Sequence, residues 1–198
     1  MSPIGLGIVG RVSVDLFATV REPISIVTVV DAAHATMREL LGLDSLLAVE
    51  VFADPRYEQG HRLDPGRRMS EADQASDMIG GRMSAGHFEF RLSGRGGAAR
   101  FFAVEDEGMV DAVFSPTRTC AGVVVATALS LAAARRGCGQ FVDLEIRMIE
   151  PAEPDPEAFV ARTRLASRGT GFGARCELFM RQFEQLNGWP RDVSLAEV

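Results

Sequence analysis

The feature that most constrains the fold is an uncharged apolar run of 15 residues, Cys120 to Ala134. A helix built from this run is apolar on nearly every side, whereas a surface helix shows only one apolar stripe. We therefore predict a central helix over Thr117–Arg136 that is covered on several sides and ends at Gly137. A bilayer span needs about 20 apolar residues, so the run predicts no membrane partner.

Period-two alternation of apolar residues predicts the strands around this helix. They are expected at 11–20, 46–53, 88–92, 100–105, 109–114 and 140–149. Helical spacing predicts the remaining helices. They are expected at 26–42, from the N-cap Ser70 to about Met83, at 155–165, and after the glycine-rich stretch 168–173. The polar segment Asp54–Met69 contains two Asp-Pro steps and predicts a long loop.

These elements predict an α+β fold with a mostly antiparallel sheet of about five to seven strands and helices packed on one face. The strands at 88–114 form a meander, which argues against the alternative, a doubly wound α/β fold. We expect one domain over 1–189 and a loose tail over 190–198. Because strand, helix and strand recur in that order at 11–53 and 109–149, a duplicated βαβ unit stays open as an alternative.

Composition excludes several kinds of chemistry. All 21 basic residues are arginine, and a guanidinium neither forms an imine nor acts as a general base at neutral pH. The net charge of -6 disfavours a nucleic-acid partner. Three cysteines without a CxxC pair predict free thiols and, with no signal-peptide pattern at the amino terminus, a cytoplasmic location. The abundance of Ala, Gly and Arg is typical of a GC-rich bacterial genome.

The segment Asp54–Met69 holds the first group of candidate site residues. They are Tyr57, His61, Arg62, Arg67 and Arg68. His61 with Asp64 offers a base and the carboxylate that orients it, and the arginines offer a clamp for a carboxylate or a phosphate. The alternative is a solvated loop in which the tyrosine serves only as a packing anchor.

The outward faces of two predicted strands hold the second group. One face carries His87, Glu89 and Arg91, and the other carries Asp143, Glu145 and Arg147. Alternation places each trio on one side of its strand. Neighbouring strands would join the trios into a polar patch for acid–base work or for a basic protein loop. The alternative is cross-strand ion pairing on a water-facing sheet.

Other motifs are weaker. Gly5–Gly10 matches G-x-G-x-x-G but lacks the preceding strand that a dinucleotide site needs. Gly169–Gly173, between Arg168 and Arg175, offers an anion site or an ordinary helix connection. The three histidines lie far apart in the sequence, so neither a metal site nor a cofactor is predicted.

Two hypotheses for the function follow. The first is a non-catalytic bacterial interaction protein (an inhibitor, immunity-type or adaptor protein) that uses a polar, acidic sheet face and has a protein partner. The alternative is a small-molecule enzyme or ligand-binding domain, with a site built from the 54–69 loop and the His87/Glu89 strand. A deep pocket that gathers His61, His87 and Arg62 would favour the alternative.

Overall fold

The apolar run forms the centre of the molecule, as the sequence predicts. In the computed structural model it is α3, Cys120–Arg136, and every residue from Gly122 to Ala134 is buried. The Thr119 side chain caps the helix by accepting a hydrogen bond from the Gly122 amide at 3.0 Å. The structure describes residues 15–46, 48–58, 61–80, 86–94, 97–106, 109–117, 119–142, 155–169 and 171–187.

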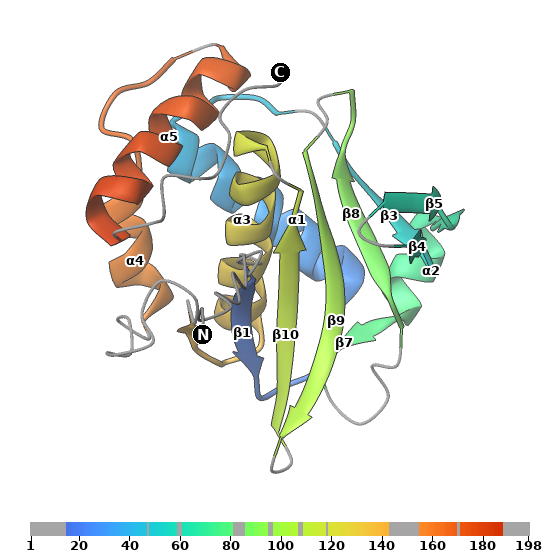
Figure 1. Cartoon of the computed structure of the whole chain (residues 1–198). Helices are drawn as coiled ribbons and strands as arrows, with labels where there is room; N and C mark the ends of the chain where they lie inside the picture. Colours follow the sequence, from blue (N-terminus) through green and yellow to red (C-terminus); the bar gives the residue numbers. More distant parts are fainter. Residues whose placement is uncertain are drawn as a thin grey trace, which may run out of the picture.

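One face of a seven-stranded sheet lies against α3 (Figure 1). The strand order is β11-β1-β10-β9-β8-β3-β6, and every neighbouring pair is antiparallel. The strands are β1 (Leu16–Val20), β3 (Val49–Ala53), β6 (Arg67–Arg68), β8 (Phe88–Leu92), β9 (Ala98–Asp106), β10 (Met109–Pro116) and β11 (Phe141–Val142). The α+β class and the antiparallel sheet are therefore confirmed.

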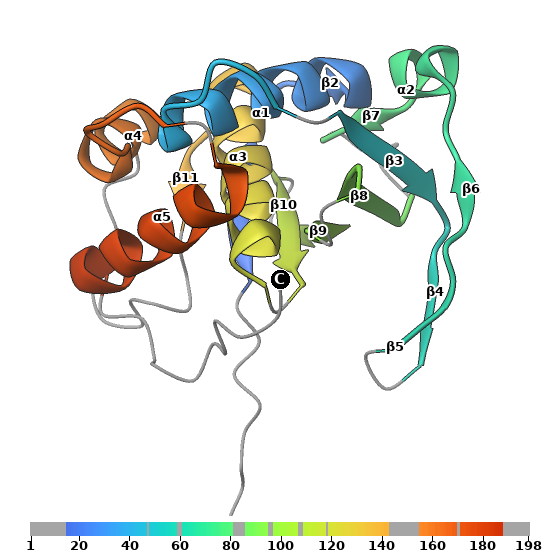
Figure 2. The same ribbon diagram turned by 90° about the horizontal axis from the view of Figure 1, so that it is seen from above.

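The helices cover the same face of the sheet. In Figure 2, α1 (Ile26–Leu41) runs across the top of the view with α3 beneath it, and α1 packs against α3 more extensively than any other helix does. α1 begins at the N-cap Ser25 and ends at Gly42, whose φ of 61° is the left-handed conformation that favours glycine. α4 (Pro156–Thr163) and α5 (Phe172–Asn187) flank this pair.

Phenylalanines from three adjacent strands fill the core between sheet and helices. The ring centroids of Phe101 and Phe114 are 5.4 Å apart, and those of Phe88 and Phe101 are 5.8 Å apart. Phe90 lies beside Phe114, with 6.0 Å between the centroids. Because side chains alternate along a strand, the residues between these phenylalanines point to the opposite face, away from the helices.

The loop predicted over Asp54–Met69 is wrong. The segment contains β4 (Arg56–Glu58) and β5 (His61–Asp64), which pair as a hairpin, and then β6, which joins the sheet beside β3. A polar sequence forms strands here because ion pairs across the ladder and main-chain pairing with β3 replace the apolar contacts that the periodicity rule looks for.

The helix predicted from Ser70 to about Met83 is too long. Its start is confirmed, because Ser70 and Asp73 form a capping box. The helix, α2 (Glu71–Ser76), is short, and Met78–Ile79 form β7, which pairs with β2 (Ile24–Ser25) just before α1. Pairing with β2 gives the backbone of β7 the hydrogen bonds that a longer helix would have supplied.

The suggested duplication stays a prediction. Both segments contain a strand, a helix and a strand, namely β1–α1–β3 and β10–α3–β11. However, three strands separate β1 from β3 in the sheet, while only β1 separates β10 from β11. The Gly5–Gly10 motif, most of the strand expected at 140–149 and the tail over 190–198 lie outside the described residues.

Candidate functional site

A buried carboxylate lies on the sheet face that points away from α1 and α3. Glu89 is the second residue of β8, between Phe88 and Phe90, which point into the core. The residue is only 3% exposed. A buried charge is unfavourable unless hydrogen-bonding and charged partners compensate for its lost hydration. The partners of the Glu89 carboxylate therefore define the candidate site.

Side chains from the hairpin and from β8 itself bind this carboxylate. The Tyr57 hydroxyl donates a hydrogen bond to Oε2 of Glu89. Nη1 of Arg62 donates to Oε1 at 3.0 Å, and Nε of Arg91 donates to the same oxygen at 3.0 Å. With Arg100, which faces Glu89 from β9, these residues form a group that we call the Glu89 cluster.

Two aromatic rings fix the orientation of the guanidinium groups. The Arg100 guanidinium lies over the Tyr57 ring, 4.5 Å from its centroid. The Arg91 guanidinium lies over the Phe52 ring at 4.4 Å. Burial raises the pKa of the Glu89 carboxyl, and the positive charge of Arg100 acts in the opposite direction.

The hairpin reaches Glu89 because of its register and of the turn that follows it. Tyr57 and Arg62 are cross-strand partners, which places both side chains on one face of the hairpin. Gly66 then turns the chain back toward β3 with a φ of 75°, and its amide donates to Asp64 at 2.9 Å. A Cβ at Gly66 would collide with the Ala53 carbonyl, so the close approach requires glycine.

The structure thus brings together four of the predicted site residues and separates others from them. Tyr57, Arg62, Glu89 and Arg91 meet in the cluster. Arg67 and Arg68 make no hydrogen bond to Glu89 and instead form ion pairs of 2.7 Å with Asp73 and Glu50, respectively. Sequence reasoning missed Arg100, although the alternation of the meander would have placed it on the face of Glu89 had the register of β8 and β9 been known.

His34 and His87 make no hydrogen bond or ion pair to the Glu89 cluster in the described part of the chain. His87 is exposed, and its carbonyl accepts a hydrogen bond from the Asp54 amide at 2.8 Å. The backbone of His61 pairs with Glu58 near the turn of the hairpin. Asp143, Glu145 and Arg147, which were expected to extend the polar patch, lie outside the described residues.

The glycine-rich stretch before α5 is a helix connection. Arg175 is buried, and its Nε donates to the Leu41 carbonyl at 2.6 Å while Nη1 donates to Oγ of Ser167 at 3.1 Å. The Leu165 amide donates to the Leu40 carbonyl at 2.8 Å. These donors satisfy the last carbonyls of α1, so Arg175 is committed to this contact and is not oriented toward an anion in solvent.

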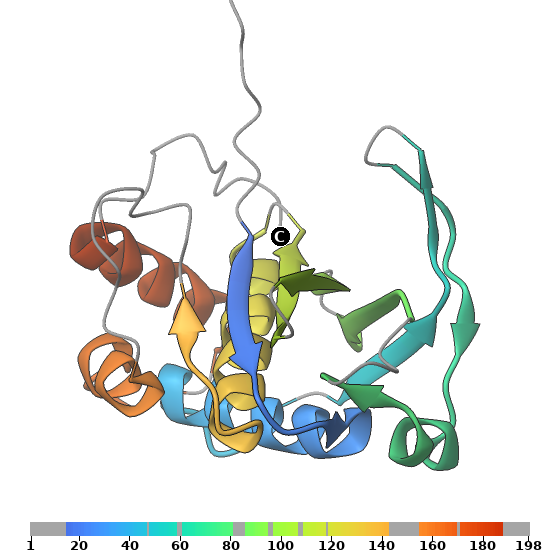
Figure 3. The same cartoon turned by 90° about the horizontal axis from the view of Figure 1, so that it is seen from below.

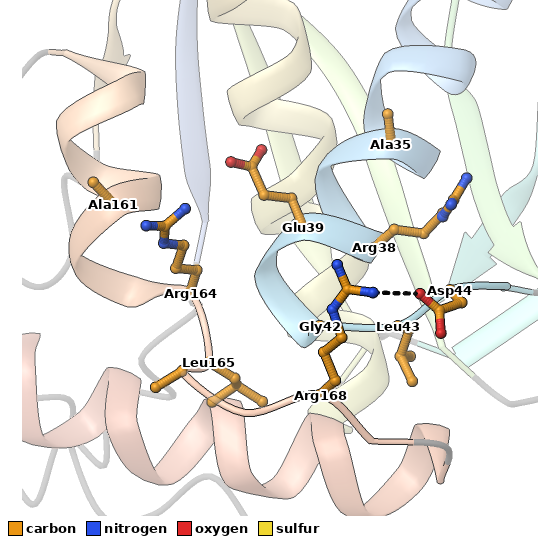
Figure 4. A pocket seen from close by; sticks show the side chains of 11 residues that line it. Ala35, Arg38, Glu39, Gly42, Leu43, Asp44, Ala161, Arg164, Leu165 and Arg168 are labelled. Atoms are coloured by element: carbon orange, nitrogen blue, oxygen red, sulfur yellow. Dashed lines mark hydrogen bonds and ion pairs between the residues drawn. The ribbon is translucent and has the colours of Figure 1, made fainter.

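Two cavities lie on the helical side of the molecule. The first, of about 720 Å³, opens between α1, α4 and the chain after α4 (Figure 4). Its lining includes Ala35, Arg38, Glu39, Gly42, Leu43, Asp44, Ala161, Arg164, Leu165, Ala166 and Arg168. The second, of about 390 Å³, shares Ala35 and Glu39 with the first. Among the residues that the structure describes, no histidine and no member of the Glu89 cluster lines either cavity.

Within the described ranges, no group of three or more His, Cys, Asp or Glu side chains could hold a metal ion. No helix in that part of the chain is long and apolar enough to cross a membrane. Cys120 and Cys176 are buried and Cys138 is exposed, and none of the three forms a disulfide. Comparison with protein-family models, with curated proteins and with solved structures finds no match to this chain, so the geometry of the site alone supports a functional conclusion.

Proposed function

We propose that the chain is a non-catalytic interaction protein that binds a protein partner through the outer sheet face and the β4–β5 hairpin. The hairpin stands out from the sheet on the side away from α1 and α3, as Figures 2 and 3 show. The observation that supports the proposal best is that four of the predicted site residues meet where this hairpin contacts β8, and that none of these four lines either of the two cavities.

The hairpin also exposes an apolar side chain. Leu63 on β5 is 65% exposed, more than any other large hydrophobic residue in the described part of the chain. An exposed leucine on its own is ordinary, but this one directly follows Arg62 in β5 and belongs to the same hairpin as Tyr57. Arginine, aromatic and apolar side chains together resemble the composition of interface centres. The partner surface that we propose therefore consists of Leu63, the Glu89 cluster and the exposed His87.

A capture experiment with matched variants tests the location. The doubly substituted Leu63→Asn/His87→Ala protein is compared with Leu178→Asn/Arg168→Ala, which changes the exposed leucine of α5 and an exposed arginine on the helical side. We expect the wild type and the second variant to retain one protein at fixed stoichiometry from lysate of the source organism, by native mass spectrometry. We expect the first variant to lose at least nine tenths of it. Equal retention by both variants would contradict the proposal.

One observation favours a second candidate function, the binding of a small molecule. The cavity of about 720 Å³ between α1 and α4 is within the usual size range of ligand pockets, and Leu43 and Leu165 give it an apolar surface beneath charged side chains. This site differs from the one expected from the 54–69 segment. A bound compound of defined mass, lost when Ala161→Trp fills the cavity, would support it.

A further inference from the structure

Positive charge is concentrated at the Glu89 cluster, although the chain as a whole is acidic. Three guanidinium groups, those of Arg62, Arg91 and Arg100, surround the single carboxylate of Glu89. The cluster thus carries a formal excess of two positive charges. The cluster should therefore attract a negatively charged partner. The sequence alone suggested the opposite, an acidic face that binds a basic partner.

The arginines around the cluster do not share this excess. Arg56 pairs with Asp64 at 2.9 Å, and Arg68 pairs with Glu50 at 2.7 Å. Arg67 likewise pairs with Asp73. Each of these three arginines has its own carboxylate, whereas Arg62, Arg91 and Arg100 surround the single carboxylate of Glu89.

The geometry leaves donors available on these groups. A guanidinium has five N–H groups in one plane, and stacking on a ring occupies the face of that plane rather than its edge. Arg100 lies on Tyr57 and Arg91 lies on Phe52, so their orientations are fixed in advance. Arg62 keeps 41% of its side chain exposed while one of its nitrogens binds Glu89. A ligand therefore binds donors that are already oriented, so the arginine side chains lose little entropy on binding.

We infer that the Glu89 cluster binds carboxylate side chains from an acidic segment of the protein partner. This inference depends on the proposed interaction function and specifies the partner's chemistry. A carboxylate accepts two parallel N–H bonds from one guanidinium, which suits groups held at fixed orientation. A nucleic acid fits less well, because a long polyanion would also meet the remaining surface of a chain whose net charge is -6.

A defined peptide tests this directly. Fluorescein-labelled octaglutamate is titrated with the protein at low salt and followed by fluorescence anisotropy, with labelled octaglutamine as the uncharged probe. We expect saturable binding of octaglutamate that weakens as salt is added, and at least tenfold weaker binding of octaglutamine. If octaglutamate binding does not approach saturation at 1 mM protein, the Kd is weaker than about 1 mM, which is too weak for recognition. That result would overturn the inference.

Two single substitutions remove the same charge from the same hairpin. Arg62→Gln takes a guanidinium from the cluster, whereas Arg56→Gln takes one that already pairs with Asp64. We expect about tenfold weaker octaglutamate binding for Arg62→Gln and less than twofold for Arg56→Gln. Equal weakening by the two would show a general charge effect and overturn the inference. If Arg62→Gln unfolds, Arg100→Gln provides a second variant, because Arg100 makes no hydrogen bond to Glu89. We again expect about tenfold weaker binding of octaglutamate.

The two proposals fail in different ways. If the wild-type protein does not bind octaglutamate but Leu63→Asn/His87→Ala still loses the captured protein, the proposed interaction surface is supported. The inference that its partner is acidic is then wrong. If the captured protein is retained by Leu63→Asn/His87→Ala, the interaction surface itself is wrong, whatever the peptide does.

Discussion

Strands β8 and β9 present two faces that follow opposite physical rules. On the helical side, Phe90 and Phe101 are packed in an apolar core that needs only matching volume and exclusion of water. On the outer side, Glu89 and Arg100 are part of a polar cluster whose contacts depend on distance and direction. One sheet thus combines an apolar face whose burial stabilises the fold with an opposite face whose oriented donors we propose for binding a partner.

The largest expected effect comes from breaking the apolar face. Phe101→Ala removes a ring that lies between Phe88 and Phe114, and we expect the free energy of unfolding to fall by about 3–5 kcal/mol. The matched control is Phe102→Ala, one residue along β9 on the outer face, where the side chain is only half-buried. Urea denaturation followed by circular dichroism gives both values, and a loss for Phe102→Ala as large as that for Phe101→Ala would contradict the division between the faces.

A smaller effect tests the polar contact on the helical side. Arg175→Leu leaves the Leu41 carbonyl without its donor, and we expect a loss of about 2 kcal/mol in the free energy of unfolding. Arg168→Ala breaks the ion pair with Asp44, in which both side chains are more than four-fifths exposed, and should cost less than about 0.5 kcal/mol. Comparable thermal unfolding midpoints for the two variants would show that Arg175 does not fasten α5 to α1.

The outer face should respond more weakly. Tyr57→Phe removes the hydroxyl that donates to Glu89 but keeps the ring under Arg100, so we expect a loss of about 1 kcal/mol in the free energy of unfolding. Tyr57→Leu removes the ring as well and should cost more. If denaturant titration finds Tyr57→Phe as stable as the wild type, the hydroxyl does not help to hold the hairpin on the sheet.

The smallest expected effect is a dependence of stability on pH. The folded-state pKa of Glu89 is raised above the ordinary value of 4.5, so the folded protein keeps a proton that the unfolded chain releases. The contribution of Glu89 to stability is therefore greatest below pH 4.5 and decreases as the pH rises toward the folded-state pKa. In a pH series of urea titrations, wild-type stability relative to Glu89→Gln should decline across that window, and a rise would reverse the assigned direction.

The sequence by itself determined the elements that depend on local pattern. The charge-free run fixed α3 as the central helix, alternation fixed the strands of the meander, and Ser70 with Asp73 fixed the start of α2. The same alternation put Glu89 and Arg91 on one face. These inferences succeeded because hydrophobic period and helix capping involve residues only a few positions apart.

Only the tertiary structure decided how distant polar residues meet. Glu89 binds Tyr57 and Arg62 across separations of 32 and 27 residues, and Arg175 reaches the end of α1 from 134 residues away. No period in the sequence encodes these contacts, because they depend on strand register, on the turn at Gly66 and on the placement of α5. The polar segment 56–68 became strands for the same reason: pairing with β3 and the buried charge of Glu89 supplied what its local composition lacked.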